Sequence, residues 1–117
     1  MAWIYKPRIK RRNNQKREER NDVYSSSLWK RLRKAKLREI PICEICELEG
    51  KTTLAIDVHH LVSFVNADNE IERDNLAFDY NNLASLCKSC HSRIHNGDLK
   101  GCNTIEQIKK RLKELKN

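Results

Sequence analysis

The amino-acid sequence predicts a small α+β domain with flanking helices, stapled by a bound metal ion. Three observations support this fold class: a polar composition, an alternation of helical and β-rich segments, and two matched cysteine pairs. The chain has 117 residues, of which 34% are charged and only 6% are aromatic. A chain of this size and composition buries only a modest apolar core, so a bound metal ion would add substantially to its folding stability.

The first part of the chain is strongly basic. We expect residues 1–24 to form a flexible arm and residues 25–117 to form the folded domain. Residues 6–20 carry eight basic and two acidic side chains and almost no apolar ones. The net charge of +8 favours a polyanionic partner, nucleic acid before a membrane. The candidate contacts to this partner in the arm are Lys10, Arg11 and Arg12. A disordered, solubilising tail is the alternative interpretation of the arm.

The segment 25–41, SSSLWKRLRKAKLREIP, predicts a helix. One of its three leading serines can cap the helix, and Pro41 follows its end. Its apolar positions, which we expect in the core, are Leu28, Trp29, Leu32 and Ala35. Basic residues occupy the other faces, Lys36 among them, and the candidate nucleic-acid contacts are Lys30, Arg31, Arg33 and Lys34.

The rest of the chain predicts alternating short elements. Residues 43–50 form a knuckle that ends at Gly50, and residues 52–64 are rich in β-formers and predict a strand. Residues 66–82 are polar and acidic and predict a long loop. The remaining segments predict a strand over 83–87, a short helix over 88–98 and an amphipathic helix over 104–116. The last helix has a capping box of Thr104 and Gln107 and an apolar stripe of Ile105, Ile108, Leu112 and Leu115.

Four of the five cysteines form two C-x2-C pairs, separated by an interval of 40 residues. This pattern favours one tetrahedral structural zinc ion over reduced core cysteines or a redox motif. Disulfides are less expected, since the charged N-terminus has no signal-peptide pattern. The predicted zinc ligands are Cys43, Cys46, Cys87 and Cys90. Cys102 has no partner motif, and we expect a free thiol there.

All four histidines fall in two short motifs. In a helix, His91 and His95 would lie one turn apart on one face, which suits two ligands of one ion. In a strand, His59 and His60 would point to opposite faces, so one could ligate a metal ion and the other could stay free as a base. Such an arrangement is typical of metal-assisted hydrolysis. The alternative is that the histidine pair in the strand is merely structural.

The order of these motifs resembles the HNH endonuclease family, whose fold is the ββα-metal or His-Me finger. The resemblance covers roughly residues 28–95 and rests on the His-His strand, the Asn in NNL, and LC-x2-CH on a helix. The four-cysteine form is similar to small nucleases often encoded by phages and prophages. The resemblance implies that His59 ligates the catalytic metal ion and that His60 is the general base.

The same resemblance implies roles for three further residues. Asn82 braces the loop that positions the base, and His91 is a metal ligand. His95 is a second helix ligand, as in the colicin-like branch, while other branches lack it. The chain departs from many relatives in two ways. Asp57 stands two residues before His59, where relatives often place Asp directly before the base, and no Pro or Gly follows the His-His strand closely. Asp57 either orients an imidazole or is a surface residue.

We therefore expect a metal-dependent endonuclease that acts on double-stranded DNA and leaves 5′-phosphate and 3′-hydroxyl ends. Its cofactors would be a structural zinc ion and one catalytic divalent ion: Mg, Mn, Ni or Zn. A phage packaging protein or another specificity-providing protein is a conceivable partner, and a cytoplasmic location in a bacterial or phage-infected cell is expected. The alternative function is a non-catalytic, zinc-stabilised nucleic-acid-binding module.

Overall fold

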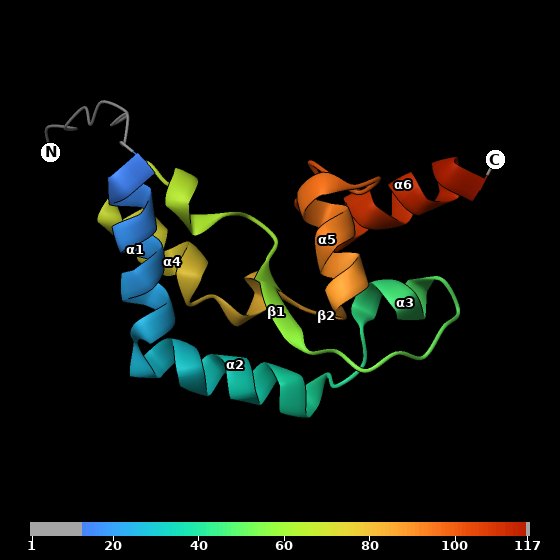
Figure 1. The fold of residues 1–117 in the computed structure, drawn as a ribbon, viewed down its shortest axis with the longest axis horizontal. Coiled ribbons are helices and arrows are strands. Elements are labelled where there is room, and N and C mark those ends of the chain that lie inside the picture. The colour runs from blue at the N-terminus through green and yellow to red at the C-terminus, as the bar shows by residue number, and fades with distance from the viewer. Residues whose placement is uncertain (1–12, 117) are drawn as a thin grey trace, which may run out of the picture.

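A two-stranded antiparallel sheet stands at the centre of the protein, with helices on both sides (Figure 1). The computed structural model describes residues 13–116. In chain order the elements are α1 (Asn13–Ser25), α2 (Ser27–Glu39), α3 (Glu44–Leu48), β1 (Asp57–His60), η1 (Phe64–Asn66), α4 (Glu70–Ala77), η2 (Tyr80–Asn82), β2 (Leu83–Leu86), α5 (Lys88–Asn96) and α6 (Ile105–Lys116). The predicted α+β class with flanking helices is confirmed. None of the described helices combines the length and apolar character that crossing a lipid bilayer requires.

Strands β1 and β2 pair over four residues, from Asp57 opposite Leu86 to His60 opposite Leu83. Helix α5 follows β2 at once, which completes a ββα unit. The strand predicted over 52–64 is therefore too long. Its partner β2 has room for only four residues, because η2 ends directly before it and α5 begins shortly after it. Among the described residues outside the named strands, an isolated antiparallel bridge pairs Ile42 with Leu54. The strand expected near residue 83 and the helix expected near residue 88 are both present.

The long loop predicted for residues 66–82 is wrong, because helix α4 lies inside it. The Asn69 side chain accepts a hydrogen bond from the Glu72 backbone N–H at 2.8 Å and so caps the helix. Glu70 and Glu72 place negative charge in the first turn, where the helix dipole favours it. These local signals outweigh the polar composition that predicted a loop.

Two apolar clusters flank the sheet. The larger one surrounds the cysteines and joins α3, β2, α5 and α6. The second cluster joins α1, α2, η1, α4 and β2, and consists of Val23, Trp29, Phe64, Ala77 and Leu83. Figure 1 shows α1 and α4 on one side of the sheet and α5 and α6 on the other. Each side of β1 therefore faces its own set of helices.

The predicted arm is only partly described, and Lys10, Arg11 and Arg12 lie outside the described residues. From Asn13 to Ser25 the chain forms helix α1, and Val23 is only 2% exposed. In this stretch the structure differs from the flexible arm that the composition predicts, because Val23 anchors the end of the helix in the second core. The boundary between arm and domain at residue 24 stays a prediction.

Helix α2 forms where the sequence predicts it, but two of its residues lie elsewhere than expected. Leu28 is 42% exposed and does not join the core stripe. Lys36, expected on the basic face, is buried and pairs with Glu44 at 3.4 Å. Its ammonium group also lies 5.1 Å above the centre of the Tyr80 ring. The ion pair links α2 to α3. It also stabilises the buried ammonium group of Lys36, which would be unfavourable without a charged partner.

Ser26 caps helix α2, and we expect this cap to contribute measurably to the free energy of unfolding. Its Oγ accepts a hydrogen bond from the Trp29 backbone N–H at 3.2 Å. Ser26→Ala should lower the free energy of unfolding by about 1 kcal/mol, the usual value of such a cap, in urea denaturation. Ser25→Ala is the matched control, because Ser25 is exposed and, among the described residues, its hydroxyl makes one long hydrogen bond, to the Asp22 carbonyl at 3.5 Å. Equal losses from both substitutions would contradict the capping role.

Candidate metal centres and nucleic-acid cleft

The four paired cysteines meet between the beginnings of helices α3 and α5. Cys43 and Cys87 are the N-cap residues of these helices, and Cys46 and Cys90 lie in their first turns. The Cys46 sulfur is 3.8 Å from that of Cys87 and 3.6 Å from that of Cys90. A tetrahedral zinc ion with Zn–S bonds of about 2.3 Å separates its sulfurs by about 3.8 Å. All four sulfurs lie within 4.8 Å of one another, so the cluster fits one zinc ion.

The ionisation of these thiols depends on their burial. Burial raises the pKa of Cys43 and of Cys90 above the usual range of a thiol. Burial acts in the same direction on Cys87, but hydrogen bonds, first from the Cys90 backbone N–H, outweigh it and lower the pKa of Cys87. Four thiolates together therefore require a cation at their centre, which is the usual condition for structural zinc binding.

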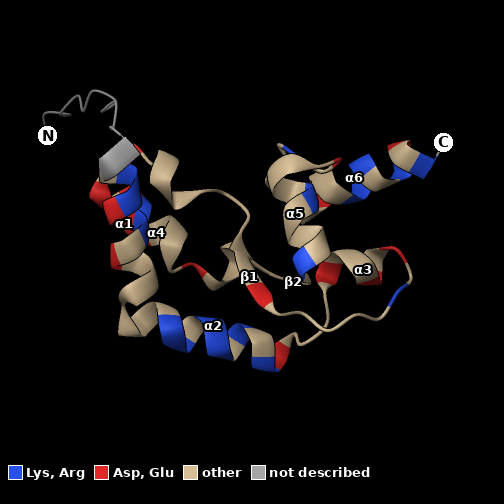
Figure 2. Ribbon diagram, in the orientation of Figure 1, with Lys and Arg blue, Asp and Glu red and all other residues tan. Residues whose placement is uncertain are grey.

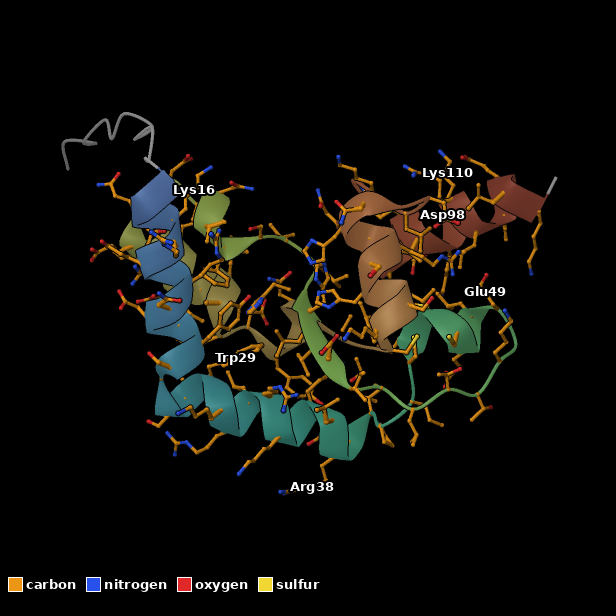
Figure 3. The ribbon with its side chains drawn as sticks, in the orientation of Figure 1. Lys16, Trp29, Arg38, Glu49, Asp98 and Lys110 are labelled. Carbon is orange, nitrogen blue, oxygen red and sulfur yellow. The ribbon has the colours of Figure 1, made fainter. Side chains whose placement is uncertain are left out.

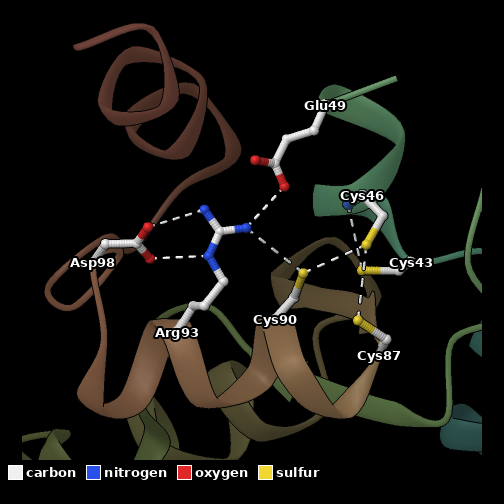
Figure 4. A network of polar contacts seen from close by, with 7 residues as sticks. All are labelled: Cys43, Cys46, Glu49, Cys87, Cys90, Arg93 and Asp98. Carbon is white, nitrogen blue, oxygen red and sulfur yellow. Dashed lines mark hydrogen bonds and ion pairs between the residues drawn. The ribbon is translucent and has the colours of Figure 1, made fainter. Parts of the chain in front are cut away.

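Arg93 lies beside this cluster and was not singled out by the sequence analysis (Figure 4). Its guanidinium donates to Glu49 at 2.8 Å and to both carboxylate oxygens of Asp98 at 2.9 and 3.1 Å. The same group lies 3.9 Å from the Cys90 sulfur. A zinc ion with four thiolates carries a net negative charge, which this cation partly offsets. Its sequence position could have indicated this contact, since Arg93 stands one helical turn after Cys90 in the predicted helix.

Three histidines form a second cluster, which joins β1 to α5. The His59 ring centre is 5.1 Å from that of His91 and 5.2 Å from that of His95. The Nε2 atoms of His91 and His95 are 3.0 Å apart. Asp57 Oδ2 lies 3.1 Å from His91 Nδ1, so it orients the His91 ring and leaves Nε2 toward the cluster. The structure thus brings Asp57 to an imidazole.

The His59 side chain contains a buried nitrogen that calls for a partner. Its Nε2 atom has no hydrogen bond within the part of the chain that the structure describes. A buried polar atom without a partner is unfavourable, and a metal ion would satisfy it. Burial, followed by the charges of His91 and His95, lowers the pKa of His59 to about 3, and burial also lowers the pKa of His95. Neutral imidazoles are the form that binds metals, so this donor set fits a divalent transition-metal ion.

His60 occupies the opposite side of β1, as strand alternation predicts. It is only 6% exposed, and its Nε2 lies 2.9 Å from the Ala77 carbonyl oxygen at the end of α4. Because a carbonyl oxygen only accepts, Nε2 carries the proton, and Nδ1 keeps its lone pair in the neutral ring. Burial lowers the pKa of His60, and the hydrogen bond to Ala77 offsets part of this effect.

Asn82 braces the chain around His60. Its side-chain oxygen accepts from the Val62 N–H at 2.9 Å, and its amide group donates to the carbonyls of Val62 and Leu76 at 3.0 Å each. Its backbone carbonyl accepts from the Leu61 N–H at 2.8 Å. These bonds hold the segment after β1 against the end of α4, whose Ala77 carbonyl contacts His60. These contacts support the bracing role expected of Asn82, which stays a prediction.

A cleft of about 460 Å³ contains all four histidines in its walls. Strand β1 and helix α5 form one side, and α1 and α2 form the other, where Figure 3 labels Trp29. Arg20 and Arg33 add two cations to the wall of α1 and α2. Lys30, Arg31 and Lys34 do not line the cleft but lie exposed along α2, and Figure 2 shows this helix rich in basic residues. The cleft thus brings together three histidines that could hold a metal ion, the ring of His60 and a basic border.

Comparisons with known proteins agree with this geometry. A family model described as HNH endonuclease matches residues 43–97, the stretch that contains both cysteine pairs and all four histidines. The crystal structure of the HNH endonuclease of the deep-sea thermophilic bacteriophage GVE2, with a manganese ion, is similar to this chain at 30% sequence identity and a TM-score of 0.58. The match covers 68% of this chain and 82% of that one. No curated protein sequence matches the chain.

The cysteine cluster predicts one tightly held zinc ion. Cys43→Ser should remove the metal and unfold much of the protein, because structural zinc contributes roughly 10 kcal/mol or more to small domains. Elemental analysis of dialysed protein and a thermal melt measure the two effects. Cys102→Ser is the matched control, since Cys102 is a buried free thiol of the same apolar cluster but lies outside the four-sulfur group. Wild-type protein without zinc, or zinc loss in the control, would contradict the assignment.

Proposed function

Because the chain belongs to the HNH endonuclease family, we propose that it is a metal-dependent nuclease that hydrolyses phosphodiester bonds in double-stranded DNA. The observation that carries this proposal is the contrast across β1. On one side His59 lies beside two helix histidines, and its buried Nε2 has no hydrogen-bond partner among the residues that the structure describes. On the other side His60 donates from Nε2 to a carbonyl, and its Nδ1 has no hydrogen bond among residues 13–116. A pure binding module has no use for this division of roles.

The residues that would hold the catalytic ion are His59, His91 and His95. When bound, a divalent ion supplies positive charge that stabilises the scissile phosphate and the leaving oxygen. Nitrogen donors suit Zn, Ni or Mn better than Mg, although Mg remains an alternative. The four cysteines would hold a separate zinc ion with a structural role.

His60 is the proposed general base. Its Nδ1 atom takes a proton from a water molecule, whose oxygen then attacks the phosphorus. The bond between phosphorus and the 3′ oxygen breaks, and the leaving oxygen takes a proton from solvent. The products are a 5′-phosphate and a 3′-hydroxyl end. Asn82 supports this step at a distance, because it holds the segment whose carbonyl fixes His60 Nε2.

The basic border of the cleft is the proposed DNA-binding surface. Arg33 lies in the wall of the cleft, and Lys30, Arg31 and Lys34 are exposed on the same helix. Contacts from such residues to phosphates position a duplex without reading its bases. Lys10, Arg11 and Arg12 are proposed to add phosphate contacts from the N-terminal arm.

Substitution of the two neighbouring histidines separates their roles. His59→Ala should weaken metal binding, and added metal should restore part of the cleavage. His60→Gln keeps a donor for the Ala77 carbonyl but cannot take a proton, so metal binding should persist. Its cleavage rate should fall by about two to four orders of magnitude, the usual contribution of a general base.

Calorimetric metal titration and single-turnover cleavage of supercoiled plasmid, with and without EDTA, measure both effects. Metal loss in His60→Gln, with retention in His59→Ala, would reverse the two assignments. Wild-type protein that binds DNA but leaves it intact with Mg, Mn, Ni and Zn would favour the non-catalytic binding module instead.

The role of α2 in DNA binding predicts a specific effect of salt. Replacing Lys30 and Lys34 together by Glu should weaken binding and flatten its salt dependence by about 0.9 log–log units for each lost phosphate contact. Replacing Lys110 and Lys113 on α6 by Glu is the matched control, since both pairs are exposed and change the net charge equally. Equal losses in filter-binding titrations would mean that net charge alone matters and that α2 is not the contact surface.

A further inference from the structure

The imidazole of His60 lies inside a cage of three aromatic rings. The Trp29 ring stacks on it with centroids 4.7 Å apart and an interplanar angle of 26°. The Phe64 ring lies in a T-shaped arrangement with it, with centroids 4.8 Å apart and an angle of 72°, and the Tyr24 ring centre lies at 6.1 Å. The only hydrogen bond of the ring within residues 13–116 joins Nε2 to the Ala77 carbonyl. Of the three aromatic contacts, that of Trp29 is the one between nearly parallel faces.

One hydrogen bond does not determine the orientation of an imidazole. It restrains the position of Nε2, but the ring can still turn, since the torsion between Cβ and the ring has a broad energy minimum. A flat surface against the ring face removes this freedom, because a turn of the imidazole would collide with the indole. The Phe64 ring is steeply inclined to the imidazole and covers less of it than a parallel ring does, so it limits this rotation less.

Trp29 is itself firmly held. It is 5% exposed, and its backbone N–H is bound by the capping Ser26. The Tyr24 ring packs on it edge to face at 5.5 Å and 62°. Trp29 therefore presents a rigid surface, built from α2 and α1, to a histidine on β1. No requirement of a metal site explains this surface, because His60 is not among the three clustered histidines.

We propose that Trp29 is a positioning residue for His60, whose stacked indole fixes the imidazole plane so that Nδ1 points to one place in the cleft. The inference rests on the proposed function, because it concerns the base of that reaction. General-base catalysis requires the nitrogen to lie within hydrogen-bond reach of the attacking water. A displacement of about 1 Å in a reacting group can slow a reaction about a hundredfold. Helix α2 thus has two roles: its Trp29 orients the His60 ring, and its basic residues border the cleft.

The test compares two substitutions that keep an apolar side chain at residue 29. Trp29→Phe retains a flat face, and Trp29→Leu does not. Trp29→Leu should lower kcat about 10- to 100-fold with KM for plasmid DNA little changed. Trp29→Phe should recover most of this loss. Metal affinity should stay at the wild-type value in both variants, because neither substitution touches the three clustered histidines.

A second measurement does not depend on cleavage. In the protein with its structural zinc bound and no other divalent ion added, the ring protons of His60 should show an upfield ring-current shift in the NMR spectrum, which Trp29→Leu largely removes and Trp29→Phe keeps in part. Val23→Ala is the control for general loosening, since Val23 belongs to the same apolar cluster but is not one of the rings on His60. It should lower the melting temperature while kcat and the His60 shifts remain close to wild type.

The outcomes separate the inference from the proposed function. If the wild-type protein cleaves DNA and Trp29→Leu cleaves with the same kcat, the inference is overturned and the nuclease proposal stands. A kcat loss in Val23→Ala as large as in Trp29→Leu would also overturn it. If wild-type protein does not cleave, the proposed function fails and takes the inference with it. Should Trp29→Leu not fold, Trp29→Met, which is flexible and has no flat face, replaces it with the same expected loss.

Discussion

The convergence of four cysteine sulfurs at one point is the constraint on which the rest of the structure depends. Two of these cysteines begin α3 and two begin α5, so their meeting brings the starts of two helices together across an interval of 40 residues. Closing such an interval costs chain entropy, and the polar composition offers a small apolar core to offset it. Binding of the metal ion that fits this cluster would supply much of the remaining folding free energy.

The position of α5 then determines the histidine cluster. Helix α5 carries Cys87 and Cys90 at its beginning and His91 and His95 along the face toward β1. A short helix with its first turn held at the sulfur cluster has little freedom to shift its later residues. Arg93 adds to this restraint, because it joins α5 to Glu49 beyond α3 and to the turn at Asp98. One short helix thus contributes side chains to both the cysteine cluster and the histidine cluster.

The pairing of β1 with β2 serves a different purpose, which is to separate two adjacent histidines. Strand alternation sends His59 toward α5 and His60 toward the aromatic second core. Each therefore has its own surroundings: imidazoles and a carboxylate on one side, and indole, phenyl and a helix-end carbonyl on the other. A slip of one residue in the strand register would exchange these surroundings, so the contacts of Asn82 around β1 are also contacts that maintain the site.

The sequence by itself determined the features that depend on residue type and short spacing. The two C-x2-C pairs, the His-x3-His spacing and the alternation of His59 and His60 specify their chemistry locally, and the family follows from their order. Helices α2, α5 and α6 were predictable because their caps and apolar positions act within a few residues. Helix α4 was missed because its composition is polar, although its Asn69 cap and acidic first turn were visible.

Only the tertiary structure decided which distant groups meet. The pairing of Lys36 with Glu44, the contact of Asp57 with His91, the ion pair of Arg93 with Glu49 and the stacking of Trp29 on His60 each join different parts of the chain. Such contacts depend on how the helices pack after the chain has closed, and local spacing carries no record of that packing. The residue types alone could therefore name a metal ligand and a base, while the orientation of each imidazole depended on partners that lie far away in the sequence.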